Sequence, residues 1–584
     1  MLEATATLLR MAFSACLFCL SCYGWGKLFC KSLRLRCSRF LWPALGIPPL
    51  LVLFGPLVLC RVADRTVLLA AVVIGGVFGA VDIYQHVRLV PMLRGFRESR
   101  ESWAYCVVFI GFLGILGGSA LGGFAMHADR VGYAVNVARL LQAGRYGPDP
   151  FNARMAITSL GGQNVLLGLL ASTGLSLYQL RILERAIVPV FLFLALWGML
   201  RDVGARPLIR WWVILLNMYL VILLGVGGGE TKTLTGTFTS IPLYLCLLWV
   251  VLTEPLNSYR TMLCLAFLCA SAILLKGSQI VILAMLIFAI VLSFHKSAWS
   301  LRQALRWGML AVAVILTLLP WMLNLRISNG TLLYPFLGQG YYGARYGTYY
   351  SPSIMDTLKD PYALMQVFQL CLLLVPLMAV GFMSFRLGCP ELHFPCEHMI
   401  SLSRLRIGLW GLLPLGAMIL LAETGAIRYT GTPVLLLGVV TGMWWAVVAS
   451  RREDNLRVVA RKHWVLAIVF IVVLINPART SIGELSRDIK RGLATAGAMP
   501  EPISQKAVQK VQQVVPAGSL ILARMGQAYF LDFSRNPIWH LDMPGASSLP
   551  PGLPLNKNVD AVRAYFRQCG IRYVMYSEID DGGH

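Results

Sequence analysis

Long apolar runs recur along most of this chain and constrain its fold more than any other feature. A helix that crosses a bilayer needs roughly 20 apolar residues, and the runs near this length are 43–60, 66–82, 102–126, 186–200, 236–252, 261–275, 279–294, 308–323, 363–385, 405–422 and 431–449. The chain is 57% hydrophobic and 13% charged, about half the charge of a soluble domain. The sequence therefore predicts a polytopic α-helical membrane protein. The first run, about 5–26, lacks the features of a signal peptide, so we expect it to be a retained helix.

The basic residues gather in short connections between the apolar runs. The chain has 51 Lys and Arg against 27 Asp and Glu, a formal net charge of +24, which in a soluble protein would suggest a nucleic-acid partner. Here the basic clusters are 31–39, 88–100, 201–210, 296–306, 386–406 and 451–462. The positive-inside rule predicts that these connections are cytoplasmic, so membrane lipids and no nucleic acid are the expected partners. The alternation predicts about 14 spans, with both termini outside.

Three long segments are expected on the far side of the membrane, namely 127–165, 324–362 and the tail from 477 to the end. The tail has the composition of a soluble protein and a polar helical stretch near 485–514. Its other predicted elements are a strand at Ser519–Arg524, a helix at Val559–Gln568 and a strand at Arg572–Tyr576. The sequence therefore predicts a transmembrane part, 1–476, and a small extracytoplasmic (periplasmic) α/β domain, 477–584.

The segment from His127 to Tyr146 has the pattern of an interfacial helix. Its apolar residues are Val131, Ala134, Val135, Ala138 and Leu141, and its polar face carries Arg130, Asn136, Arg139 and Gln142. This spacing predicts a helix that lies on the membrane and stops at Gly144. Asp129 opens the helix, where a carboxylate caps the N-terminus and is favoured by the helix dipole. A capping Asp at a membrane rim can also face a substrate, so the two interpretations of Asp129 are compatible.

This segment resembles the first outer loop of the C-type (GT-C) glycosyltransferases, membrane enzymes that use polyprenyl-phosphate-linked sugars. Members of that superfamily place an Asp or Glu just after an early helix, then a Tyr, then a Leu-x-x-Gly-like end to an interfacial helix. Asp129, Tyr133 and Gly144 match this layout. The chain departs from the pattern in two ways: several spans precede the loop where many members have one, and the usual acidic pair is a single Asp beside His127.

Further segments resemble the same superfamily in order and spacing over roughly 120–450. Arg326 follows an apolar span and precedes an Asn-Gly-Thr turn and the sequence Tyr-Pro-Phe at 334–336. Many bacterial members carry an Arg, a Gly-Asn-Pro-like turn and Tyr-Pro-Phe at this point. Lys276 opens an outer connection, and Arg428-Tyr429 precedes a late helix, as similar residues often do in these enzymes.

The resemblance implies a single-displacement, inverting transfer of a sugar to an acceptor hydroxyl. Asp129 would be the general base, with Glu230 as the alternative. Outer cations would offset the charge of the departing phosphate, although each one alone could instead contact anionic lipid. The residues expected to bind substrate are His127, Arg130, Tyr133, Glu230, Lys232, Lys276, Arg326, Tyr334, Arg345, Arg428 and Tyr429. No metal ligand is assigned, and assistance by a divalent cation is left open.

The expected setting is the inner (plasma) membrane, with the active site on the extracytoplasmic side. The donor would be a lipid-linked sugar, and the acceptor an envelope glycan, a lipid or a protein. A transporter or flippase of lipid-linked glycans is the main alternative, yet the chain shows no convincing internal repeat. An O-antigen ligase or polymerase is a closer alternative, but it would base its chemistry in one large late outer loop.

The cysteines do not point to a different chemistry. Cys16, Cys19 and Cys22 lie within an apolar run, where thiols pack as small hydrophobes. A second cluster, at 389–398, contains two Cys and two His that could bind zinc, but its spacing matches no standard finger. We therefore expect the 389–398 loop to be dispensable. The sequence has no P-loop, dinucleotide fingerprint or metalloprotease motif.

Overall fold

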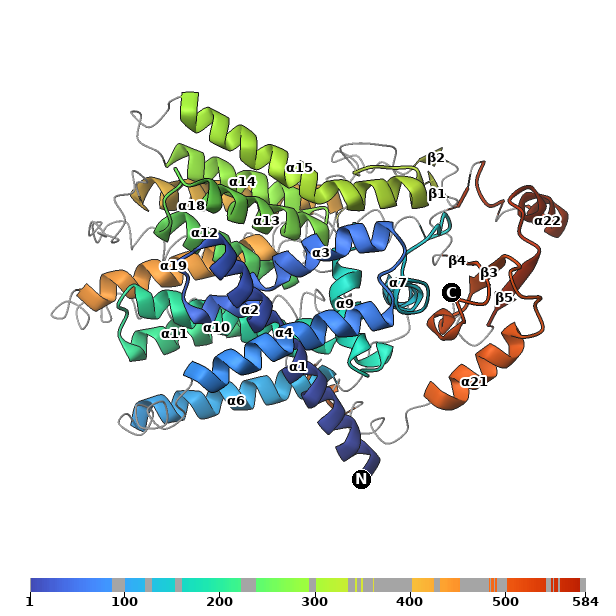
Figure 1. Cartoon of the computed structure of the whole chain (residues 1–584), viewed down its shortest axis with the longest axis horizontal. Coiled ribbons are helices and arrows are strands. Elements are labelled where there is room, and N and C mark those ends of the chain that lie inside the picture. Colours follow the sequence, from blue (N-terminus) through green and yellow to red (C-terminus); the bar gives the residue numbers. More distant parts are fainter. Residues whose placement is uncertain are drawn as a thin grey trace.

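The computed structural model describes a mostly helical chain (Figure 1). The residues that it describes are 2–86, 100–120, 129–152, 160–221, 238–293, 301–333, 342–343, 348–349, 361, 402–424, 431–451, 483, 485–487, 489–490, 501–541, 548–549, 551–554 and 557–577. Most helices lie side by side along the long axis of the molecule, as a bundle, and α7 lies between one end of this bundle and the C-terminal tail.

Most helices of the bundle follow the predicted apolar runs, whereas the helices at 162–172 and 207–220 match none of them. Their bounds are α1 (Leu2–Leu33), α2 (Trp42–Leu45), α3 (Ile47–Leu59), α4 (Arg65–His86), α6 (Arg100–Ala120), α9 (Gly162–Ser172), α10 (Val188–Asp202), α11 (Pro207–Leu220), α12 (Ile241–Thr253), α13 (Tyr259–Leu275), α14 (Gln279–Leu292), α15 (Leu301–Asn329), α18 (Leu402–Thr424) and α19 (Gly431–Arg451). Among the described residues, five stretches are long and apolar enough to cross a membrane: Thr5–Leu33, Arg39–Leu59, Arg65–Gln85, Leu177–Asp202 and Leu301–Ser328. The expected total of about 14 stays a prediction, because the run 363–385 lies outside the described residues.

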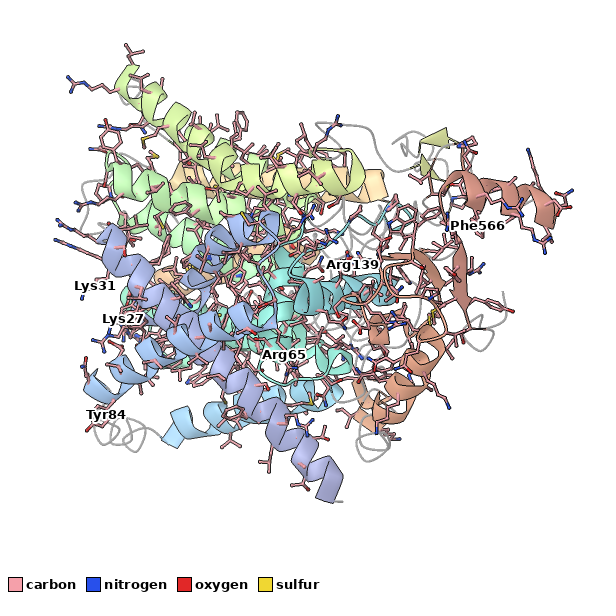
Figure 2. All side chains as sticks on the ribbon, turned by 45° about the vertical axis from the view of Figure 1, so that its right-hand side comes forward. Lys27, Lys31, Arg65, Tyr84, Arg139 and Phe566 are labelled. Carbon is pink, nitrogen blue, oxygen red and sulfur yellow. The ribbon has the colours of Figure 1, made fainter. Side chains whose placement is uncertain are left out.

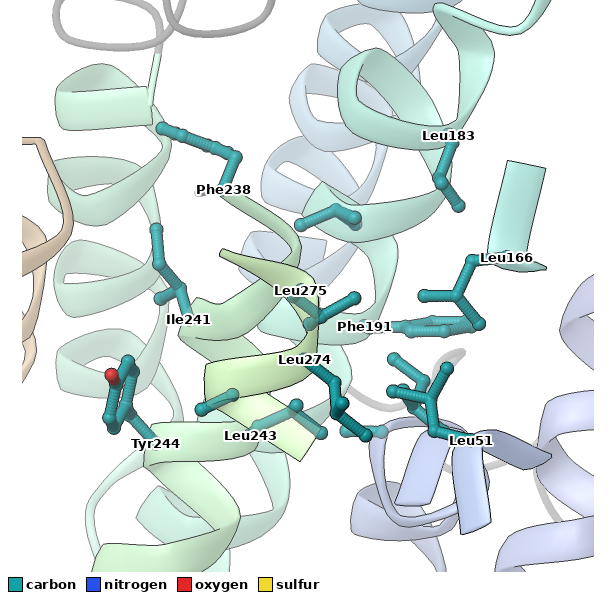
Figure 3. Packing of buried hydrophobic residues seen from close by; sticks show 14 of the residues in the cluster. Leu51, Leu166, Leu183, Phe191, Phe238, Ile241, Leu243, Tyr244, Leu274 and Leu275 are labelled. Carbon is teal, nitrogen blue, oxygen red and sulfur yellow. The ribbon is translucent and has the colours of Figure 1, made fainter. Parts of the chain in front are cut away.

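The outer surface of the bundle is apolar, as a lipid-facing surface must be. Val73 and Val77 on α4 are 45% and 56% exposed, and Val312 and Leu316 on α15 are 55% and 62% exposed. A contiguous apolar surface of this kind is rare on a soluble protein. The interior is also apolar, and Figure 3 shows Leu51, Phe191, Leu274 and their neighbours packed between the helices. The architecture is therefore that of a membrane protein.

Glycines and one buried ion pair join α1 to α4. A Cβ atom placed on Gly24 would lie 1.9 Å from the carbonyl oxygen of Gly75, so only glycine allows the two backbones to approach this closely. Beside Gly24 on α1, the Tyr23 hydroxyl donates to the Asp82 carboxylate at 2.7 Å, and Lys27 Nζ lies 2.6 Å from the same carboxylate. A carboxylate among apolar helices needs such partners, since burying it without them is costly.

Several basic connections gather at one end of the bundle. The backbone N–H of Arg36 donates to the Glu254 carboxylate at 2.6 Å, and the Arg201 guanidinium lies over the ring of Phe40. The opposite end carries α7 (Asp129–Ala143), whose stop at Gly144 (φ 64°) lies against the backbone of Arg61. In Figure 2, Lys27 and Lys31 lie toward one end and Arg139 toward the other. The basic connections 31–39 and 201–210 therefore lie at the same end of the bundle.

The tail contains a small parallel sheet flanked by helices. Its elements are α21 (Glu501–Gln512), β3 (Ile521–Arg524), η9 (Ala528–Phe530), β4 (Ile538–His540), α22 (Val559–Gln568) and β5 (Tyr573–Tyr576). The strand order is β4-β3-β5, and Ile521 pairs with both Ile538 and Tyr573. Strands β3 and β5 match the two predicted strands, whereas β4 was not predicted. A second sheet, in the outer loop after α15, consists of β1 (Tyr342–Gly343) and β2 (Thr348–Tyr349).

The tail shares its core with the loop that follows α7. Phe151 is buried among tail residues, with its ring centroid 5.7 Å from Trp539 and 6.4 Å from Tyr565. The predicted boundary between 476 and 477 lies outside the described residues. Independent folding of 477–584 therefore stays a prediction.

We expect the two ends of the bundle to face opposite sides of the membrane. Paired reporters, each active on only one side, fused after Arg97, after Arg452 and after Tyr576, should place the first two in the cytoplasm and the third outside. The physical reason is that Lys and Arg near span ends are retained on the cytoplasmic side. A tail reporter active in the cytoplasm would overturn the orientation of every loop.

Candidate functional site

The N-terminus of α9 is where three of the predicted site segments meet. Gly161, at φ 104°, precedes the helix and accepts a 2.7 Å hydrogen bond from the Tyr146 hydroxyl. Tyr146 belongs to the segment after α7, and its ring stacks on Trp321 of α15 at 6.5 Å between centroids. The start of α9 is therefore bound both to the chain that follows α7 and to α15.

Lys276 lies at the same place, at the end of α13. A Cβ atom on Gly162 would lie 2.8 Å from the carbonyl oxygen of Leu274, so the end of α13 abuts the start of α9. Lys276 follows two residues later and is buried. Nearby, the Tyr244 hydroxyl lies 3.0 Å from Oε1 and 3.1 Å from the backbone oxygen of Gln279. A buried lysine at the end of an apolar helix is the kind of group that marks a functional site in a membrane protein.

Arg326 lies on an exposed part of the last turn of α15. Its guanidinium donates to the carbonyl oxygen of Gly330. Two residues further on, Ser328 contacts the segment after α7, because a Cβ atom on Gly147 would lie 3.2 Å from the Ser328 hydroxyl. The structure thus brings the ends of α13 and α15 and the segment after α7 to one end of the bundle.

The other predicted site residues divide into two groups. Asp129 and Arg130 are the first two residues of α7, as predicted, and Tyr133 is buried within the same helix. The rest lie outside the described residues, as does the 389–398 loop: His127, Glu230, Lys232, Tyr334, Arg345, Arg428 and Tyr429. Within the part of the chain that the structure describes, no group of three or more His, Cys, Asp or Glu side chains could hold a metal ion.

The polar face of α7 is buried, which corrects the expectation that it is exposed. Asn136 and Arg139 were expected to face water or lipid head groups, yet both are buried. The apolar face of α7 packs against α9 and α4, and η9 of the tail covers another part of the helix. The helix is buried on both faces because a segment almost 400 residues away in the sequence supplies the cover.

A buried ion pair connects α7 to the tail. Arg139 Nη2 lies 2.6 Å from Asp149 Oδ2 and donates to the carbonyl oxygen of Ile538 at 3.0 Å. Asp149 Oδ1 accepts from the backbone N–H of His540 at 3.0 Å, and Arg139 also donates to the carbonyl oxygen of Tyr146. The Arg139 and Asp149 side chains are 5% and 4% exposed. Charge-assisted hydrogen bonds shielded from water are the stronger kind.

A second buried polar cluster was not predicted from the sequence. Glu184 is fully buried on the π-helix η3 (Leu183–Ile187), and the Gln163 amide and the Thr239 hydroxyl both lie 3.4 Å from its Oε1. Thr239 is on η6 (Phe238–Ser240), directly after the segment that carries Glu230 and Lys232. The available signal was Arg181, Glu184 and Arg185 at the head of the apolar run 186–200. A π-helical turn and an ionisable residue among apolar helices are both features of functional sites.

Comparisons with known proteins give similarity to solved structures. No protein-family profile and no curated protein matches the sequence. The structure is similar to the crystal structure of ArnT from Cupriavidus metallidurans bound to undecaprenyl phosphate, with 14% identity, a TM-score of 0.41, and coverage of 82% of this chain and 90% of that chain. It is also similar to ArnT from the same organism in the apo state, with 15% identity, a TM-score of 0.38, and coverage of 75% and 85%. These neighbours belong to the GT-C superfamily, which the outer loops resemble.

His540 should make the docking of the tail depend on pH. Burial, together with the Arg139 guanidinium, lowers the pKa of His540 to about 3, well below the usual value of about 6.5. The folded state therefore excludes a proton that the unfolded tail binds. The contribution of neutral His540 to the stability of the folded tail is fully present above about pH 6.5. It decreases as the pH falls toward 3, by up to about 1.4 kcal/mol per pH unit.

Limited proteolysis of the tail in the purified full-length protein, at steps between pH 7.5 and 4.5, measures this effect. Cleavage should accelerate below pH 6.5, and His540→Gln, which carries no titrating imidazole, should flatten the dependence. An identical pH profile in the variant would show that His540 is not the responsible group.

Proposed function

We propose that this chain is a membrane glycosyltransferase that moves a sugar from a polyprenyl-phosphate-linked donor to an acceptor hydroxyl. The reaction would take place on the extracytoplasmic face of the inner membrane. The main support is that the segment after α7, the helix that begins at Asp129, meets the ends of α13 and α15, which carry Lys276 and Arg326, at one end of the bundle. These segments are far apart in the sequence, and each was selected by its resemblance to the same superfamily.

The charges at this end suit a phosphate leaving group. Lys276 is buried and Arg326 is exposed, so one cation lies within the protein and the other lies at its surface. A lipid phosphate reaches such a place from the membrane, with its chain in the lipid and its head group at the rim. Cations fixed in a site shielded from water stabilise the charge that develops as the glycosidic bond to phosphate breaks. Departure of the phosphate then needs no general acid.

The acceptor hydroxyl needs a base as it attacks the anomeric carbon, and Asp129 is the proposed group. Its place at the start of a buried helix is compatible with this role, since the helix dipole favours a carboxylate there. A single base, together with a phosphate leaving group that needs no general acid, favours direct displacement with inversion. Glu230 is the alternative base, and Glu184 adds a buried carboxylate on the membrane side of the same region.

Asp129→Asn tests the base directly. Asn keeps the size and most of the capping ability of Asp, so the protein should fold, while transfer should fall by roughly 10²–10⁴-fold, as for the loss of a general base. The measurement is sugar transfer from a polyprenyl-phosphate donor by purified, monodisperse protein.

The matched control is Asp202→Asn, which removes an exposed carboxylate that pairs with Arg201 on the C-terminal turn of α10. It should leave transfer within about two-fold, because an exposed ion pair contributes little. If Asp129→Asn is as active as the parent, Asp129 is not the general base and only caps the helix.

Lys276 and Arg326 should act on the donor. Replacing Lys276 with Met or Arg326 with Gln should raise the KM for the polyprenyl-phosphate sugar by about 10- to 100-fold, the value of a lost hydrogen bond to a charged group. Each helix offers its own control at its other end, where the exposed Arg260 and Arg302 are the second residues of α13 and α15.

Arg260→Met and Arg302→Gln should leave the donor KM unchanged. If the variants at the two ends of a helix behave alike, the cations serve general lipid contact and the phosphate site lies elsewhere.

A further inference from the structure

We propose that the Arg139–Asp149 pair clamps the edge of the tail sheet onto α7 and thereby holds in place the helix that begins at Asp129. In this arrangement Arg139 and Asp149 are positioning residues for the transfer reaction, a role that rests on the proposed function. The clamp itself is a property of the fold, and it can be measured without any substrate.

The first observation is the hydrogen bonding at the free edge of the sheet. Strand β4 faces β3 through its neighbours in the ladder: Ile521 donates to the carbonyl oxygen of Pro537, and Leu541 donates to that of Ala523. In an extended strand the groups of alternate residues point to opposite sides. The carbonyl oxygen of Ile538 and the N–H of His540 therefore point away from β3, toward the place of a missing fourth strand.

Arg139 and Asp149 occupy the place of that strand. Arg139 donates to the Ile538 carbonyl oxygen and Asp149 accepts from the His540 N–H, both at 3.0 Å. One side chain thus supplies the donor and the other the acceptor that a neighbouring backbone would supply. The unpaired backbone groups of a sheet edge can pair with another chain in water and are costly to bury. The Arg139–Asp149 pair forms hydrogen bonds with these groups and at the same time fixes the position of the edge.

The clamp has a second contact on the same face of α7. The Gln142 amide donates to the Leu531 carbonyl oxygen at 3.2 Å and accepts from the Phe533 N–H at 2.7 Å. The Phe533 ring lies under the Arg139 guanidinium, 5.2 Å from its centroid. Two successive turns of one helix are therefore bound to the tail backbone, which restrains both the position and the rotation of α7.

The restraint extends from the clamp to the proposed catalytic groups. Asp129 is ten residues before Arg139 on the same helix, about 15 Å along its axis. In the other direction, Arg139 binds the Tyr146 carbonyl oxygen, and Tyr146 contacts both Gly161 and Trp321. A rigid helix transmits a shift at one end to the other, and small errors in the placement of a reacting group reduce the rate strongly. Loosening the clamp should therefore reduce kcat more than donor binding.

The experiment measures amide hydrogen exchange and transfer in the full-length protein, for Arg139→Ala, Arg139→Lys and Asp149→Asn. We expect faster exchange in β4 and also in α7, together with a kcat about 10- to 100-fold lower and a donor KM within about three-fold of the parent. Arg139→Lys keeps one charged donor, so its exchange rates and its kcat should lie between those of Arg139→Ala and the parent. This milder variant also provides a result if Arg139→Ala fails to fold.

The control is Arg535→Ala, since Arg535 donates to the carbonyl oxygens of Val515 and Gln513 within the tail. It should accelerate exchange in the tail without affecting α7 or kcat. The double variant Arg139→Asp/Asp149→Arg should not restore docking, because a carboxylate at 139 would face the Ile538 carbonyl oxygen.

The outcomes separate the clamp from the activity. Unchanged exchange in α7 when β4 is released would overturn the clamp, as would full restoration by the reversed pair. Faster exchange in both elements with an unchanged kcat would retain the clamp and overturn the positioning role. A parent protein without transfer from any polyprenyl-phosphate sugar would overturn the proposed function, and the exchange results would still decide whether the tail restrains α7.

Discussion

The need to pair polar groups away from water governs this structure from one end to the other. Among apolar helices, an unpaired hydroxyl, amide or charged group cannot form a hydrogen bond with water instead. Several hydroxyls within the bundle therefore bond to the carbonyl four residues earlier, as Thr253 does to Trp249 and Thr441 to Leu437. Asp82 has both Lys27 and Tyr23. Some polar groups are costly to bury even when they are paired. Their presence indicates a structural or functional role.

Two such places lie toward the same end of the bundle. One is the cluster of Gln163, Glu184 and Thr239, in which the Gln163 amide and the Thr239 hydroxyl both lie 3.4 Å from Glu184 Oε1. The other is the Arg139–Asp149 pair, whose contacts are short and complete. A buried and fully paired network of this kind fixes structure. Asp129 lies on the helix between the membrane part and the tail.

Local patterns predicted the parts of the fold that local forces determine. The apolar runs gave most of the bundle helices, and the stop at Gly144 was correct because a residue at φ 64° suits glycine. Strand β4 was missed, since three residues after a proline carry too little pattern. The burial of Arg139 was missed for a different reason. A polar residue on an amphipathic helix normally faces water, and only a contact between positions 139 and 538 reverses this. Glu184 was overlooked because the predicted apolar run began at residue 186, whereas the apolar stretch in the structure is Leu177–Asp202 and includes Glu184.

The mutual burial of α7 and β4 changes how the chain should be divided. A helix with Arg139 and Gln142 on one face cannot bury that face against apolar side chains, and a three-stranded sheet cannot leave the edge of β4 unpaired in a buried contact. Alone, the polar face of α7 and the edge of β4 would both have buried polar groups without hydrogen-bond partners. In the contact, each supplies the donors and acceptors that the other lacks. Phe151 adds an apolar side chain from the loop to the core of the tail. The composition changes near residue 477, but the packing groups the tail with the first outer loop. The unit that presents Asp129 is therefore built from both, and a tail removed at the change in composition would expose the polar face of α7 on the side of the proposed site.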